Sequence, residues 1–107
     1  MSWTSGLGAL ASLALLAGCA NLASIAPPVT PAMVGASGGA SEATLIAGRR
    51  IFTMQCTACH SADPVTKYPF AEWRQIVGKM SERSKLTVEE ESALLAYLQA
   101  APRAPVP

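Results

Sequence analysis

The chain has 107 residues, a formal net charge of +1 and a hydrophobic fraction of 50%. Its first 40 residues contain no Asp, Glu, Lys, Arg or His, so every charged side chain belongs to the segment of about 60 residues that follows. The near balance of charge in that segment argues against nucleic-acid binding. A domain of this size buries little apolar surface, and such domains usually need a disulfide, a metal or another bound group to be stable.

An apolar run extends from Leu7 to Leu16, which is the length expected for the hydrophobic region of a secretory signal. The run ends in Leu16-Ala17-Gly18-Cys19, which resembles the lipobox of bacterial lipoproteins. The resemblance implies that residues 1–18 are a signal peptide and that Cys19 becomes a lipid-modified N-terminus. Alternatively, residues 7–25 are long enough to cross a bilayer as an uncleaved helix. Either interpretation tethers the chain to a bacterial membrane, with the remaining residues on the periplasmic side.

Residues 19–40 are rich in Pro, Gly, Ser and Thr and carry no charge, a composition typical of a linker. We therefore expect a flexible, lipid-tethered linker here, followed by a folded domain over residues 41–101. Ser41 can cap a helix that covers residues 42–55. Leu45, Gly48 and Phe52 would then share one face of that helix. Because Gly48 lowers helix propensity, we expect a packing reason for it.

The run Cys56-Thr57-Ala58-Cys59-His60 forms a C-x-x-C-H motif. This motif is typical of covalent haem attachment, in which each of its three fixed residues has a separate function. Cys56 and Cys59 are expected to form thioethers with the haem vinyl groups, and His60 is expected to be the proximal iron ligand. The sequence therefore predicts one covalent haem c.

Three other interpretations of the motif were weighed. A structural zinc site lacks further ligands, because the chain has no second C-x-x-C pair and only one histidine. A thioredoxin-like redox pair needs a βαβ context, and no strand-like alternation precedes Cys56. A simple disulfide between Cys56 and Cys59 is possible in an exported protein, but it leaves the adjacent His60 unexplained.

The candidate for the sixth iron ligand is Met80. His60 is the only histidine, so a methionine is the expected partner. Met1 and Met33 belong to the signal and the linker, and Met54 directly precedes the motif. Met80 follows an amphipathic stretch over residues 70–77 and precedes a polar stretch, residues 81–85, that we expect to be a loop. Alternatively, Met80 fills the core and the distal side is open.

A last helix is expected from Val88 to Ala100, capped by Thr87, with Glu90 completing a capping box. Pro102 ends this helix, and residues 102–107 are expected to be a disordered tail. Tyr68 and Trp73, between the two candidate iron ligands, can pack in the core or donate hydrogen bonds to the haem.

Over residues 41–101 the chain resembles the class I cytochrome c family. The resemblance depends on the steps Gly48, Phe52 and Cys56, the C-x-x-C-H motif, and a final helix containing Leu94-Leu95-Ala96-Tyr97-Leu98. It implies an all-α fold of three or four helices around one haem. It also implies that the first and last helices cross near Gly48 and Phe52.

The expected function is membrane-tethered transfer of single electrons between redox proteins such as a dehydrogenase, an oxidase or another cytochrome. We expect a carrier rather than an enzyme, with no small-molecule substrate, because the sequence shows no acid/base pair in an identifiable pocket. Two alternatives stay open. One is a haem-based sensor with an open distal site, and the other is the cytochrome subunit of a periplasmic dehydrogenase.

Overall fold

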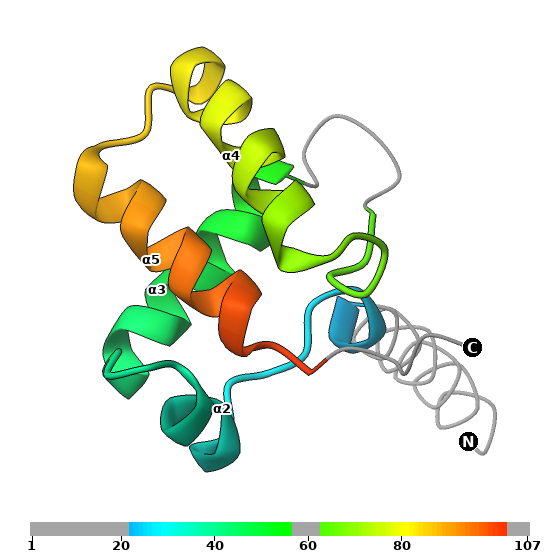
Figure 1. Cartoon of the computed structure of the whole chain (residues 1–107), viewed down its shortest axis with the longest axis vertical. Coiled ribbons are helices and arrows are strands. Elements are labelled where there is room, and N and C mark those ends of the chain that lie inside the picture. Colours follow the sequence, from blue (N-terminus) through cyan, green and yellow to red (C-terminus); the bar gives the residue numbers. More distant parts are fainter. Residues whose placement is uncertain (1–21, 57–62, 103–107) are drawn as a thin grey trace, which may run out of the picture.

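The computed structural model describes residues 22–56 and 63–102. Within these ranges the chain is mostly helical and contains no strand, so the all-α prediction is confirmed. No helix in the same ranges has the length and apolar character needed to cross a membrane. The predictions for residues 1–18, for Cys19 and for the tail beyond Pro102 lie outside the described residues. The elements are α2 (Pro31–Ala36), α3 (Glu42–Ile51), a π-helical turn η1 (Phe52–Cys56), α4 (Phe70–Ser84) and α5 (Val88–Ala100) (Figure 1).

Two helices begin where the sequence predicted. The Ser41 hydroxyl accepts a hydrogen bond from the Thr44 amide at 3.1 Å, which caps α3. At α5, the Thr87 hydroxyl accepts from the Glu90 amide at 3.1 Å, and the Glu90 carboxylate accepts from the Thr87 amide at 2.9 Å. This reciprocal pair is the predicted capping box, and it satisfies two amides that the helix itself leaves without partners.

The end of α4 differs from the expectation. We expected a loop over residues 81–85, whereas α4 continues to Ser84, and Met80 lies inside it. Trp73, Val77 and Ser81 are buried at steps of four residues, so the packed face of the helix extends beyond Met80. The polar residues that suggested a loop instead cover the exposed side of the last turn. The helix ends where Lys85 adopts a left-handed conformation with a φ of 55°.

The centre of the fold is the crossing of α3 and α5, which lie one behind the other in Figure 1. Gly48 is buried there, and a Cβ atom on it would lie 2.1 Å from the Ala93 carbonyl oxygen and 2.8 Å from the Tyr97 Cβ. Both distances are shorter than van der Waals contact, so only glycine allows this approach. The expected packing reason for Gly48 is therefore confirmed. Leu45 and Phe52, on the same face of the helix, are also buried.

Residues 26–40 do not have the character of the flexible linker that we expected. Ala26 and Met33 are buried, and Met33 lies on α2, which Thr30 caps. The Tyr97 hydroxyl donates a 2.6 Å hydrogen bond to the Pro27 carbonyl, and the Arg49 Nε donates to the Ala26 carbonyl at 3.0 Å. The segment packs because its residues are uncharged and partly apolar, so they can be buried once the folded domain supplies hydrogen-bond donors for their carbonyls.

Candidate functional site

The candidate site begins at the C-terminal end of the first long helix. Cys56 is the last residue of η1, which continues α3 without a break. Cys59 and His60 lie outside the described residues, and the description resumes at Asp63. The structure therefore places the first residue of the C-x-x-C-H motif directly after the helix that crosses α5.

An aromatic cluster fixes the helix one turn before the motif. The Phe52 and Trp73 rings meet edge to face, with centroids 5.7 Å apart and an interplanar angle of 83°. The Phe52 ring also lies 6.3 Å from that of Tyr97, centroid to centroid. Trp73 in turn meets Tyr68 edge to face at 5.1 Å. Edge-to-face aromatic pairs add stability beyond their buried area, so this cluster ties the end of α3 to both α4 and α5.

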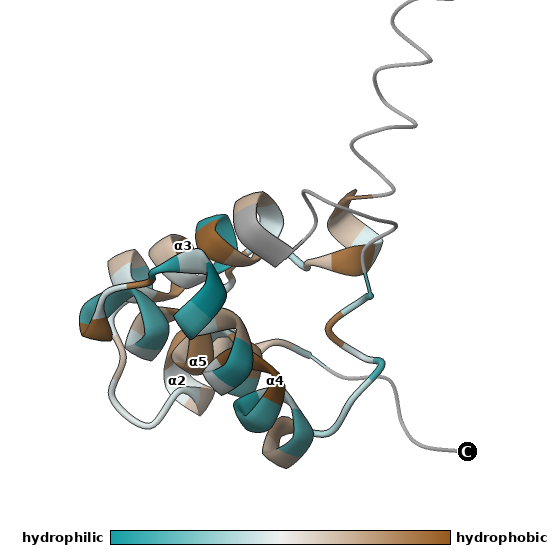
Figure 2. Cartoon of the chain, turned by 90° about the horizontal axis from the view of Figure 1, so that it is seen from above, coloured by the Kyte–Doolittle hydropathy of each residue, from teal (hydrophilic) through white to brown (hydrophobic). Residues whose placement is uncertain are grey.

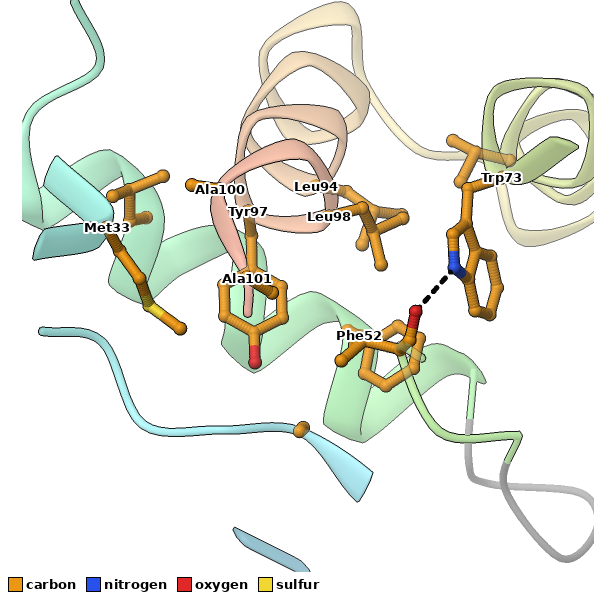
Figure 3. Close-up of a cluster of buried hydrophobic side chains, with 12 residues drawn as sticks. Met33, Phe52, Trp73, Leu94, Tyr97, Leu98, Ala100 and Ala101 are labelled. Carbon is orange, nitrogen blue, oxygen red and sulfur yellow. Dashed lines mark hydrogen bonds between the residues drawn. The ribbon is translucent and has the colours of Figure 1, made fainter. Parts of the chain in front are cut away.

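The chain that follows the motif is also held in place. The Trp73 indole Nε1 donates a 3.0 Å hydrogen bond to the Val65 carbonyl, shown as a dashed line in Figure 3. The Val65 amide donates to the Ile25 carbonyl at 2.9 Å, and the Val65 side chain is fully buried. Phe52 before the motif and Val65 after it are therefore both anchored in the core. Core packing, one of the two expectations for Trp73, describes its surroundings here, and its N–H donor is used by the backbone.

A surface ion pair lies beside this anchor. The Lys67 ammonium contacts the Asp63 carboxylate at 2.7 Å, and both side chains are about half exposed. The hydrogen bond to Asp63 and its negative charge raise the pKa of Lys67. Because the pair is exposed, its contribution to stability is small.

Met80, the candidate distal ligand, lies on the inner side of α4. It follows Trp73 by seven residues and Val77 by three, spacings that put all three on one helix face. Met80 is only partly buried and is not among the described residues of the hydrophobic cluster. The neighbouring Ser81 hydroxyl is buried and has no hydrogen-bond partner in the described part of the chain. The thioether is therefore not committed to the packed core.

Two residues that hold the N-terminal segment were not singled out from the sequence. Tyr97 was assigned only to the apolar face of the last helix, and Arg49 was not assigned a role. Burial raises the pKa of Tyr97 to about 12, and the nearby positive charge of Arg49 opposes that shift. A buried tyrosine needs a partner for its hydroxyl. A tyrosine on an otherwise apolar helix face was therefore the available signal, although it could not identify Pro27 as the acceptor.

The donor set itself can be compared with the requirements of a c-type haem. Two cysteines at the correct spacing supply thiols for covalent attachment, the adjacent histidine supplies an imidazole, and Met80 supplies a thioether. This chemistry fits that group. No cluster of three or more His, Cys, Asp or Glu side chains that could hold a metal ion occurs within residues 22–56 and 63–102.

Comparison with known proteins gave no match to a family model, to a curated protein or to a solved structure. The function must therefore be argued from the chain's own residues.

Proposed function

We propose that this chain is a single-haem cytochrome c that transfers single electrons on the periplasmic side of a bacterial membrane, to which its N-terminus tethers it. The observation that carries the proposal is the C-x-x-C-H motif, which starts directly after the helix that crosses α5 at Gly48. A bound c-type haem supplies a one-electron couple at its iron. We further propose that residues 41–101 adopt the cytochrome c fold.

The site residues divide the work in the following way. Cys56 and Cys59 hold the haem covalently, His60 is the proximal ligand and Met80 is the distal ligand. A His/Met pair fills both axial positions, which leaves no open position for a substrate and favours a carrier over an enzyme. A Met/His pair also raises the reduction potential of the iron.

The helix crossing supports this assignment. The family resemblance implies that the first and last helices cross near a glycine and an aromatic residue, and α3 and α5 cross at Gly48, one turn from Phe52. The contacts of Phe52 and Trp73 hold the chain on both sides of the motif. Such fixed ends lower the entropy that the intervening residues must lose when they bind a cofactor. The proposed electron partners are other redox proteins, such as a dehydrogenase, an oxidase or another cytochrome.

The test is a spectroelectrochemical titration of the full chain, expressed in a host that matures c-type cytochromes. We expect a single one-electron transition and a ferrous form that does not bind carbon monoxide. Met80→Ala should open the distal position, so that the ferrous variant binds carbon monoxide stoichiometrically. Met54→Ala is the matched control, because Met54 is 59% exposed and should leave the spectrum unchanged. A chain without a haem spectrum would contradict the proposal.

A second candidate function is a haem-based sensor with an open distal site. The observation that favours it is the position of Met80 inside α4, where regular helix geometry restricts how far the sulfur can move. Rapid stoichiometric carbon monoxide binding by the unmodified ferrous chain would select this second function. In that case Met80→Ala would leave the affinity for carbon monoxide unchanged.

A further inference from the structure

The N-terminal segment leaves the folded domain close to the proposed membrane anchor. Leu22, the first described residue, follows Cys19 by three residues. Three residues span at most about 11 Å when fully extended. From Ile25 onward the segment is bonded to the domain, through the Val65 amide, Arg49 and Tyr97. The inference below depends on the proposed tether, because a lipid on Cys19 would then hold the domain directly against the bilayer.

Exposed apolar side chains are concentrated on the side of the molecule from which this segment emerges. Four large apolar residues are exposed in the described part of the chain, and three of them belong to this segment, to α3 or to η1. They are Leu22, Ile46 and Met54, which are 40%, 51% and 59% exposed. Figure 2 shows residues 22–25 on the same side of the molecule as α3, with α4 and α5 on the other side.

A groove on this side carries positive charge. It lies between the N-terminal segment and α3, has a volume of about 420 Å³, and is lined by Pro28, Val29, Ile46, Arg49, Arg50 and Thr53. Arg50 is exposed, and within the described residues it forms no ion pair. The groove on the opposite flank of α3, toward α5, is lined instead by Glu89 and Glu90. The two flanks of α3 therefore differ in the sign of their charge.

We propose that this basic, apolar side of the molecule rests on an anionic lipid surface. The name "α3 outer face" is used below for its exposed residues Leu22, Ile46, Arg50 and Met54 together with the groove. Exposed apolar side chains can enter the interfacial region of a bilayer, and arginine is attracted to anionic headgroups. The choice of a lipid surface follows from the short distance to the anchor and from the charge of the groove.

Docking in this way fixes the orientation of the candidate site. Met54 on the α3 outer face precedes Cys56 by two residues, so the start of the motif is held near the bilayer. Electron partners would then be reached at the membrane surface, because the bonded N-terminal segment keeps the domain from extending far from it.

The test uses the full mature chain reconstituted in phosphatidylcholine vesicles with and without phosphatidylglycerol. Arginines are modified with phenylglyoxal and methionines with a mild oxidant, and both are quantified by mass spectrometry. With phosphatidylglycerol present, we expect Arg50 to react about fivefold more slowly, the effect of one arginine held near an anionic surface. Met54 should be protected as well. Arg83, exposed on α4, is the matched control and should react equally in both vesicles.

Arg50→Gln should remove the lipid-dependent protection of Met54, whereas Arg83→Gln should preserve it. Equal reactivity of Met54 in the two vesicles would overturn the inference, as would protection that appears only after a partner protein is added. Recovery of the chain in the supernatant would overturn it through loss of the tether. The haem absorbance of the same samples reports separately on the proposed electron transfer, so protection without haem would support docking while contradicting the carrier.

Discussion

Two regions pack against α5 by different physical means. The α3 helix approaches it backbone to backbone at Gly48, where no other residue fits. The N-terminal segment instead is held largely by hydrogen bonds from Tyr97 and Arg49 to its carbonyls and by burial of Met33. The first region could be anticipated from a short sequence pattern, and the second could not. The comparison teaches that local spacing identifies steric contacts between helices, whereas partners for backbone carbonyls depend on the assembled fold.

The largest expected effect comes from filling the crossing. Gly48→Val places new atoms against the Ala93 carbonyl and the Tyr97 Cβ, both of which are backbone or rigid groups. Forcing the helices apart should lower the free energy of unfolding by about 3 kcal/mol or more. Chemical denaturation of the purified chain measures this.

Gly78 is the matched control for that substitution. It also lies within a helix, α4, but a Cβ atom there would meet nothing within 4 Å. Gly78→Ala should therefore raise the free energy of unfolding by up to about 1 kcal/mol, through helix propensity. Equal effects of the two substitutions would show that α3 and α5 do not cross as described.

A smaller effect is expected from the N-terminal segment. Met33 is only 2% exposed, so Met33→Ala should lower the free energy of unfolding by about 2 to 3 kcal/mol. Met54→Ala, at a position that is 59% exposed, should change it by less than about 0.5 kcal/mol. If residues 19–40 were a flexible linker, both substitutions would be equally harmless.

The smallest effect is expected at the Tyr97 hydroxyl. Its pKa in the folded chain is raised from 10.0 to about 12, chiefly by burial. Below about pH 10 both folded and unfolded chains keep the proton, so the stabilisation is intact. As the pH rises from about 10 to 12, the unfolded phenol ionises first and stability falls, by the order of 2 kcal/mol. Unfolding followed across this pH range measures the loss.

Tyr97→Phe removes both the hydroxyl and its hydrogen bond to Pro27. The variant should lose about 1 kcal/mol of stability near neutral pH and also most of the alkaline dependence. Tyr68→Phe should keep that dependence. An unchanged alkaline profile in Tyr97→Phe would show that this hydroxyl is not the titrating group.

The predictable features of the fold depend on nearby residues. Ser41 and Thr87 cap their helices through residues three positions away, so their function follows from the sequence alone. The end of α4 was predicted wrongly because Ser81 reads as polar in sequence yet is buried at the spacing set by Trp73 and Val77. The bond from Tyr97 to Pro27 joins residues 70 positions apart, and no local pattern specifies it.

The candidate site shows the same division. The position of Cys56 at the end of the first helix was expected from the spacing of Gly48 and Phe52. The bond from Trp73 to the Val65 carbonyl was not expected, because an indole donor can meet many acceptors and only the fold selects one. Ligation by Met80 stays a prediction, and the structure contributes its place on α4 and its partial burial.

The central claim is that Cys56 and Cys59 hold one haem covalently. Its most direct test is the intact mass of the mature chain after denaturation, from a host that matures c-type cytochromes. The account predicts a mass increase of one haem, lost in the double variant Cys56→Ser/Cys59→Ser and retained in Cys19→Ser. A chain whose mass shows two free thiols, or a disulfide between Cys56 and Cys59, would contradict the account.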